Sequence, residues 1–334
     1  LICIGAHEPT KCRRGLDGAV HLGHDPLPRL GIHHHAVCDE VLGRHLVERL
    51  AALGWQVRVI QRPESRAAAP AGIEAVRAPL RADGLAAAFE GTGVVFHLAG
   101  RTAAPSAAAF HQGNAVAAGE VARACRDAGA RLVHVSSQAA AGPAPANRPA
   151  TEAGEARPCS AYGISKLAGE RIVQDTVGLE WTIARPVAVY GPGDRGFLPL
   201  FRLARAGFAV IPGSPAACYT LVHVRDLVEG LIAAAERPEA VREVFFLGHP
   251  VLRTARSLAA ALGRVAGRPV RTITVPRPVL YAAAVAGDLG ARLGLPAALD
   301  RSKYRELTSS GFACEVGKAR RLLQWEACID LEEG

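Results

Sequence analysis

The chain has 334 residues, of which 49% are hydrophobic, and carries a formal net charge of +8. Its length allows one large or two modest domains, and its scattered arginines, without a basic run interleaved with aromatics, argue against a nucleic-acid-binding protein. Prolines and charges interrupt the longest apolar tract, residues 275–299, and the eight cysteines are scattered, which argues against a membrane span and a disulfide framework and favours a cytoplasmic protein.

Apolar runs and amphipathic stretches alternate along most of the chain. Helices are predicted near 42–53, 83–90, 107–128 and 160–178, and strands near 55–61, 73–78, 94–99, 131–136 and 180–185. This alternation predicts an α/β fold with a Rossmann-like, doubly wound parallel sheet that helices cover on both faces. A further strand at 244–247 is expected to return to that sheet.

The chain changes character after Pro186, where loops rich in glycine and proline follow. Residues 41–185 and 219–248 are predicted to form a dinucleotide-binding Rossmann domain, and residues 186–218 and 249–334 a smaller C-terminal substrate-binding lobe. Asp226 is interpreted as a helix cap rather than a catalytic acid.

Two of the predicted strands end on residues suited to ligand binding, because open α/β sheets bind ligands at the carboxyl ends of their strands. One ends at Leu98, Ala99 and Gly100, where small residues let a flat ligand approach the backbone. Another ends at Ser136 and Ser137 and so delivers hydroxyl groups to the same edge. We interpret the first of these serines as a strand-end hydroxyl satisfied within the fold.

The strand near 55–61 ends at Gln61, and Arg62 follows. NAD-binding Rossmann folds place an acidic residue here for the ribose 2′-hydroxyl, whereas an arginine accommodates the 2′-phosphate of NADP. The sequence therefore favours NADP over NAD, with a solvated arginine as the alternative interpretation of Arg62.

Tyr162 and Lys166 lie four residues apart in a predicted helix that Ser160 caps, so both side chains emerge on one face. A lysine ammonium beside a phenol favours the phenolate, and this lowers the pKa of a tyrosine that otherwise stays protonated until about pH 10. Such a pair is typical of a proton-transfer tyrosine, although the spacing also occurs by chance in surface helices.

Further motifs follow one another in a fixed order: His97-Leu-Ala-Gly100, Asn114, Ser136-Ser137, Tyr162-x-x-x-Lys166, Arg185-Pro186, Val189-Tyr-Gly-Pro-Gly-Asp194 and His223-Val-Arg-Asp-Leu227. In this order they resemble the extended short-chain dehydrogenase/reductases. More narrowly, the chain is similar to the NAD-dependent epimerase/dehydratase family and its 3β-hydroxysteroid-dehydrogenase-like branch. The resemblance runs from about Val41 to the last residue.

The resemblance implies roles for four residues. Tyr162 would be the acid/base that exchanges a proton with the substrate oxygen. Lys166 would lower the pKa of this tyrosine and hold the nicotinamide ribose. Ser137 would hydrogen-bond the reacting oxygen, and Asn114 would support the active-site helix. The residues that would contact the cofactor are Gly43, Gln61, Arg62, Leu98, Ala99, Gly100, Tyr162, Lys166, Pro186 and Val189.

One hallmark of the family is missing. Its members carry a strand and then a Gly-x-x-Gly-x-x-Gly turn before the first helix, but here only the last glycine, Gly43, is present. Val37 and Glu40 stand at the other two positions. A valine does not easily take the positive φ of such a turn, and a glutamate places a carboxylate where a pyrophosphate needs backbone N–H groups. Residues 30–35 before it make a poor buried strand.

Three explanations of residues 1–40 stay open. A shifted reading frame or a wrong start is favoured by the absence of methionine and by a chain that stops within an apparent motif, and half of the twelve histidines precede residue 36. A family member that has lost dinucleotide binding is the second explanation. A zinc site is the third, because Cys3, Cys12, Cys38, His21, His24 and His33–His35 are suitable ligand types, but their spacing is not that of a zinc motif, and we expect no metal.

The sequence thus predicts an NAD(P)-dependent oxidoreductase or epimerase that acts on a secondary alcohol or ketone, either a sugar nucleotide or a steroid- or flavonoid-like molecule. The alternative is a non-catalytic binding or assembly protein that keeps the fold. The partners expected are a small-molecule substrate and no nucleic acid, and the resemblance leaves room for a homodimer.

Overall fold

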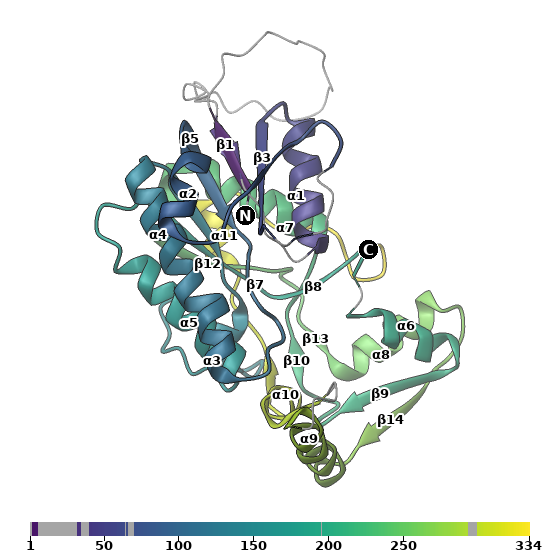
Figure 1. Cartoon of the computed structure of the whole chain (residues 1–334). Coiled ribbons are helices and arrows are strands. Elements are labelled where there is room, and N and C mark those ends of the chain that lie inside the picture. The colour runs from purple at the N-terminus through teal and green to yellow at the C-terminus, as the bar shows by residue number, and fades with distance from the viewer. Residues whose placement is uncertain are drawn as a thin grey trace, which may run out of the picture.

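The computed structural model describes residues 2–5, 32–34, 40–63, 65, 70–194, 196–292 and 299–334. An eight-stranded sheet forms the larger part of the molecule, in the order β12-β7-β6-β5-β1-β3-β4 with β2 paired to β1 (Figure 1). Its strands are β1 (Ile2–Gly5), β2 (Ile32–His34), β3 (Gln56–Gln61), β4 (Glu74–Arg77), β5 (Thr92–His97), β6 (Arg131–Val135), β7 (Trp181–Pro186) and β12 (Glu243–Leu247).

Helices cover both faces of this sheet. One core cluster joins it to α1 (Glu40–Ala52), α7 (Val224–Glu236) and α11 (Gly317–Leu322). A second cluster, on the other face, joins it to α2 (Ala82–Phe89), α4 (Ala117–Ala128) and α5 (Ala161–Gln174). Pairing is parallel from β12 through β7 and β6 to β5, and again between β3 and β4. The prediction of a doubly wound Rossmann-like sheet is confirmed, including the return of β12 beside β7.

The first strands depart from that pattern. The apolar, β-branched run of β1 lies between β5 and β3, and it runs antiparallel to both. The segment interpreted as a poor buried strand does form β2, which pairs antiparallel with β1 through Ile32–His34. Residues 35–39, where the predicted glycine turn is replaced, lie outside the described part of the chain, and α1 begins at Glu40.

The long predicted helix at 107–128 is interrupted. It consists of α3 (Ala107–Phe110), a π-helical segment η1 (His111–Val116) and α4. Short 3₁₀ segments also occur at η2 (Gln138–Ala140) and η3 (Pro238–Ala240). Because π-helical turns inside longer helices are frequent at functional sites, η1 indicates that a functional site lies nearby.

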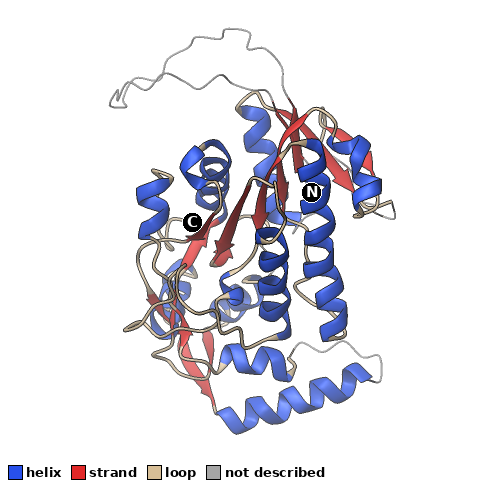
Figure 2. Ribbon diagram, turned by 90° about the vertical axis from the view of Figure 1, so that its left-hand side faces the viewer, coloured by secondary structure: helices blue, strands red, loops and turns tan. Residues whose placement is uncertain are grey.

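Segments after Pro186 also build three small sheets that are separate from the main sheet (Figure 2). Their strands are β8 (Ala188–Tyr190), β9 (Phe208–Pro212), β10 (Cys218–Tyr219), β11 (Leu221–His223), β13 (Arg253–Thr254), β14 (Arg271–Val275) and β15 (Gly311–Phe312). The helices here are α6 (Leu198–Arg205), α8 (Ala255–Val265), α9 (Arg277–Arg292) and α10 (Arg301–Leu307). A third, small core cluster lies beneath β9 and α8.

Within the described part of the chain, every helix is too short or too polar to cross a bilayer.

Candidate active site

The parallel strands β5, β6 and β7 end at one edge of the sheet, and α5 passes beside that edge (Figure 1). Edges of this kind are where open α/β sheets bind ligands. The predicted site residues Tyr162 and Lys166 lie in α5, Ser137 follows β6, and Gly100 follows β5.

Lys166 is buried at this edge, with only 4% of its surface exposed. Its Nζ donates a hydrogen bond to the carbonyl oxygen of Val135, the last residue of β6, at 2.7 Å. Burial lowers the pKa of Lys166 to about 8, and the neighbouring Glu170 carboxylate opposes that shift. The lysine is therefore fixed against the strand end, with an ammonium that is costly to bury.

Tyr162 lies one helical turn before Lys166. The helix begins with Ser160 as its N-cap, whose Oγ accepts a hydrogen bond from Gly163 N at 3.0 Å, so this predicted cap is confirmed. The Tyr162 ring packs against Phe110 of α3, with centroids 6.1 Å apart. A spacing of four residues puts the tyrosine and the lysine on one side of α5, as predicted.

Gly163 allows α5 to approach the segment that carries Ser137. A Cβ added at this glycine would lie 2.3 Å from the Ala139 carbonyl oxygen, far inside any real contact distance. Ser137 is the N-cap of η2, and its Oγ accepts a hydrogen bond from Ala139 N at 3.2 Å. The glycine next to Tyr162 therefore brings η2 and the start of α5 together.

Asn114 is buried in the π-helical segment η1 and joins three parts of the site. Its Nδ2 donates to Ser165 Oγ of α5 at 2.8 Å and to the Arg101 carbonyl oxygen at 3.1 Å, while its Oδ1 accepts from Arg101 N at 2.6 Å. A Cβ added at Gly100 would lie 3.0 Å from Asn114 Oδ1 and 3.6 Å from Lys166 Nζ. The asparagine thus ties the chain after β5 to α5, which agrees with its predicted supporting role.

A buried ion pair joins α5 to β7, one helical turn after Lys166. Arg185 of β7 donates to Glu170 of α5 through Nε at 3.0 Å and through Nη2 at 2.7 Å, and these residues are 5% and 1% exposed. Ser136 Oγ also donates to Glu170 Oε1, so the interpretation of Ser136 as a satisfied strand-end hydroxyl is confirmed. Glu170 is not among the residues predicted from the sequence, although its position four residues after Lys166 places it on the same buried face.

Two stacked histidines lie deeper in the sheet. His97 of β5 and His134 of β6 are register partners with ring centroids 5.2 Å apart, and both are almost completely buried. Among the described residues, none of their four ring nitrogens has a hydrogen-bond partner. Burial lowers the pKa of both imidazoles well below the usual value, and the positive Lys166 adds to this effect. Both rings are therefore neutral at pH 7.

The residues predicted to contact a dinucleotide come from several elements. Leu98 and Ala99 are buried directly after β5, and Gly100 is exposed beside Lys166. Gln61 ends β3, Arg62 follows it, Gly43 is buried in the first turn of α1, Pro186 ends β7, and Val189 lies in β8. The exposed glycine at the β5 end leaves the backbone approachable for a flat ligand, and contact with the cofactor there stays a prediction.

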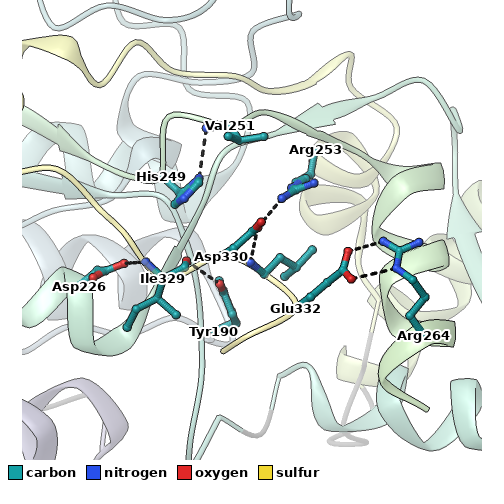
Figure 3. Close-up of polar contacts among 10 residues, drawn as sticks. Tyr190, Asp226, His249, Val251, Arg253, Arg264, Ile329, Asp330 and Glu332 are labelled. Atoms are coloured by element: carbon teal, nitrogen blue, oxygen red, sulfur yellow. Dashed lines mark hydrogen bonds and ion pairs between the residues drawn. The ribbon is translucent and has the colours of Figure 1, made fainter. Parts of the chain in front are cut away.

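The prediction that Asp226 caps a helix is wrong. His223 is the N-cap of α7, and the Asp226 carboxylate instead accepts a hydrogen bond from Cys328 N at 3.0 Å. It also accepts one from Ile329 N at 2.8 Å (Figure 3). Arg253 pairs with Asp330 in the same segment. Asp226 therefore holds the C-terminal segment against the start of α7, a tertiary contact that local sequence does not reveal.

The segment considered for zinc lies almost entirely outside the described residues. Only the backbone of 2–5 and 32–34 belongs to the described part, and no group of three metal-ligating side chains occurs among the residues that the structure does describe.

A cavity of about 440 Å³ adjoins the start of α5. Ile164 of α5, Asp288 of α9 and Arg305 of α10 are among the residues that line it. Tyr162 and Lys166 do not line it, so the cavity lies between the start of α5 and the helices α9 and α10, beside the site described above.

A model of the NAD dependent epimerase/dehydratase family matches residues 41–248, which is more than half of the chain. The chain belongs to this family. The prediction drawn from its motifs is confirmed at that level, whereas the 3β-hydroxysteroid-dehydrogenase-like branch stays a prediction.

Individual relatives agree with this assignment. The ceramide reductase of Caulobacter vibrioides is 32% identical over 282 residues, which cover 80% of each chain. Two solved structures share the fold: MoeE5 in complex with UDP-glucuronic acid and NAD, and the UDP-glucose 4-epimerase of Thermus thermophilus in complex with NAD. The first has a TM-score of 0.71 at 23% identity and covers 91% of this chain and 96% of that one. The second has a TM-score of 0.70 at 22% identity, with coverages of 90% and 95%.

The unusual burial of Lys166 leads to a prediction about stability. The pKa of about 8 in the folded chain lies below the ordinary 10.5, so the unfolded chain holds the extra proton between these values. The cost of burying the ammonium is therefore complete below pH 8 and is relieved as the pH rises toward 10.5. We expect the free energy of unfolding of the native chain, relative to Lys166→Met, to rise between pH 8 and pH 10.

Urea denaturation at a series of pH values measures this difference. Lys303→Met removes the same charge from an exposed side chain and serves as the matched control. A constant difference between the native chain and Lys166→Met over this range would show that the ammonium is not desolvated.

Proposed function

We propose that the chain is an NAD(P)-dependent oxidoreductase that interconverts a ketone and a secondary alcohol, with Tyr162 as the proton-transfer residue. The observation that carries this proposal is the buried Lys166 ammonium, held at 2.7 Å from the end of β6 and one helical turn from Tyr162. Membership of an NAD-dependent family and the similarity to a ceramide reductase support it.

In the reducing direction, a reduced nicotinamide, when bound, would supply the hydride for the carbonyl carbon. The Tyr162 hydroxyl donates its proton to the carbonyl oxygen, so the ketone gains a hydride and a proton and becomes an alcohol. Lys166 stabilises the phenolate that remains, and the Ser137 hydroxyl hydrogen-bonds the reacting oxygen. Asn114 keeps η1 and α5 in register through Ser165.

The substrate proposed is a weakly polar ketone or alcohol rather than a sugar nucleotide. The ceramide reductase covers most of the chain at 32% identity, whereas the sugar-nucleotide enzymes among the solved structures agree in fold at 23% identity or less. Steady-state turnover of NADPH or NADH with hydrophobic ketones, compared with UDP-glucose epimerisation, tests the proposal. Activity confined to the sugar nucleotide would contradict the substrate class.

A non-catalytic protein of this fold is the second candidate. The observation that favours it is the Val37 and Glu40 substitution in the glycine-rich turn. Against it stands the presence of Ser137, Tyr162 and Lys166 in one chain, a set of residues that a protein without catalysis does not need. Measurement of dinucleotide binding separates the two candidates.

The preference for NADP gives a prediction about Arg62. Its position directly after β3 is where a guanidinium reaches a ribose 2′-phosphate. We expect Arg62→Ala to weaken NADPH binding roughly tenfold, because one charge-assisted hydrogen-bonded contact is lost, and to leave NADH binding unchanged. Fluorescence titrations with both dinucleotides measure this, with the exposed Arg81→Ala as the control. Tighter binding of NADH than of NADPH by the native chain would reverse the assignment.

A further inference from the structure

The outer side of α9 is apolar from Pro278 to Leu289. Its exposed residues between the first and last turn are Pro278, Val279, Tyr281, Ala282, Ala283, Val285, Ala286 and Leu289. The large side chains among them are strongly exposed: Val279 57%, Tyr281 49%, Val285 42% and Leu289 57%. At 100° per residue, these positions cover slightly more than half of the helix circumference without a single charge. We call this surface the α9 face.

The opposite side of the helix is already occupied. Leu280 and Ala284 are buried there. Tyr281 lies at the border of the α9 face, and its half-exposed ring packs edge-on against Tyr304 of α10 with centroids 5.4 Å apart. Asp288, at the border of the apolar side, forms an ion pair with Arg301 of α10. These contacts fix the rotation of α9 about its axis, so the α9 face is directed outward by the fold itself.

The position of α9 in the molecule also leaves this face accessible. α9 lies at the extremity of the molecule that is farthest from the first helix and the N-terminal strands (Figure 1), and it forms the lower edge of the molecule in the perpendicular view (Figure 2). Scattered exposed apolar side chains are normal on soluble proteins, but a continuous stripe of this size marks an interaction surface.

The charges near the α9 face indicate what it contacts. Between residues 268 and 309, arginine and lysine outnumber aspartate and glutamate by seven to three. Asp288 is ion-paired with Arg301, and Glu306 with Lys303. Each pair removes one negative and one positive charge, so the excess of basic residues is unchanged. Exposed Arg271 and Arg277 stand at the end where β14 leads into α9. An apolar stripe with basic surroundings is complementary to an anionic bilayer, whose headgroups are negative and whose interior is apolar.

We propose that the α9 face docks the protein onto an anionic phospholipid bilayer. A helix of sixteen residues is about 24 Å long, and α9 would lie in the plane of the interface rather than across it. Val279, Val285 and Leu289 would enter the boundary of the acyl chains, Tyr281 would sit at headgroup level, and the nearby arginines would contact lipid phosphates.

The docking geometry has a consequence for the site. Asp288 of α9 lines the cavity next to α5, so docking would bring that cavity close to the lipid surface. A membrane-dissolved ketone would then be held close to α5, and this point alone rests on the proposed function. The docking itself stands on the α9 face and its charges.

Co-sedimentation with lipid vesicles tests the proposal. The probes are vesicles of equal parts phosphatidylcholine and phosphatidylserine, and vesicles of phosphatidylcholine alone. We expect the native chain to sediment with the anionic vesicles and much less with the neutral ones, and its binding to weaken with added salt. The double variant Val285→Glu/Leu289→Glu should bind at least about tenfold more weakly, because two inserted apolar side chains become carboxylates facing anionic lipid.

The matched control is Val177→Glu, which adds a carboxylate at an apolar residue that is 87% exposed and follows α5, outside the α9 face. It should bind vesicles like the native chain. All variants are checked for unchanged thermal unfolding, and for unchanged turnover of a water-soluble ketone, a readout that depends on the proposed function but not on docking.

Three results would overturn the proposal. The first is that the native chain binds both vesicle types equally or binds neither. The second is that the double variant binds anionic vesicles as well as the native chain does. The third is that light scattering shows a dimer of the native chain and a monomer of the double variant. The last result would assign the α9 face to a second copy of the chain.

Discussion

Replacing Tyr162 by phenylalanine is expected to lower turnover at least about a hundredfold, because the substrate oxygen then lacks its proton donor and general acid–base catalysis contributes factors of that size or larger. The ring, its packing against Phe110 and the helix cap at Ser160 all remain in the variant. Binding of the reduced dinucleotide should therefore be largely retained, and the loss should appear in kcat.

Steady-state kinetics together with a fluorescence titration of Tyr162→Phe separate these effects. Tyr304→Phe is the matched control, because it removes a phenolic hydroxyl from α10, away from the strand ends. Turnover of Tyr162→Phe close to that of the native chain would mean that another group transfers the proton, and the proposed mechanism would be abandoned.

The largest loss of stability is expected from Glu170→Ala. This substitution leaves the buried Arg185 guanidinium without its carboxylate partner and removes the acceptor of the Ser136 hydroxyl. Breaking one side of a buried ion pair costs about 3–5 kcal/mol. We expect the free energy of unfolding, measured by urea denaturation, to fall by about that amount.

Two comparisons make the Glu170 test specific. The exposed pair of Glu155 and Arg157 offers a matched control, and Glu155→Ala should change stability little because water screens that pair. Glu170→Met combined with Arg185→Met removes both charges and should recover much of the loss. Equal effects of Glu170→Ala and Glu155→Ala would show that the ion pair does not stabilise the junction of α5, β6 and β7.

Much of the fold follows from local pattern. The predicted strands and helices of the main sheet agree with the structure to within a few residues, because apolar periodicity and helix caps such as Ser160 are local signals. The return of β12 to the main sheet could also be predicted from the sequence, because a short apolar run after a helix returns to the sheet in such folds. The structure pairs this strand with β7.

Other features depend on contacts between distant segments. The partner of Asp226 lies about a hundred residues later in the chain, and the stacked His97 and His134 meet only because β5 and β6 are neighbours. The π-helical turn around Asn114 has no clear periodic signature, and Glu170 gains its importance from Arg185 on another strand. The antiparallel orientation of β1 likewise depends on how the strands pair in the sheet and not on local propensity.

The most direct test is a fluorescence titration of the purified, folded chain with NADPH and then NADH. The buried Lys166 one helical turn from Tyr162, the exposed Gly100 and membership of an NAD-dependent family lead us to expect saturable binding, tighter for NADPH. Circular dichroism of the same sample confirms that the chain is folded. Failure of both dinucleotides to bind a folded chain would contradict the proposed oxidoreductase and would favour a protein whose residues Val37 and Glu40 have abolished the cofactor site.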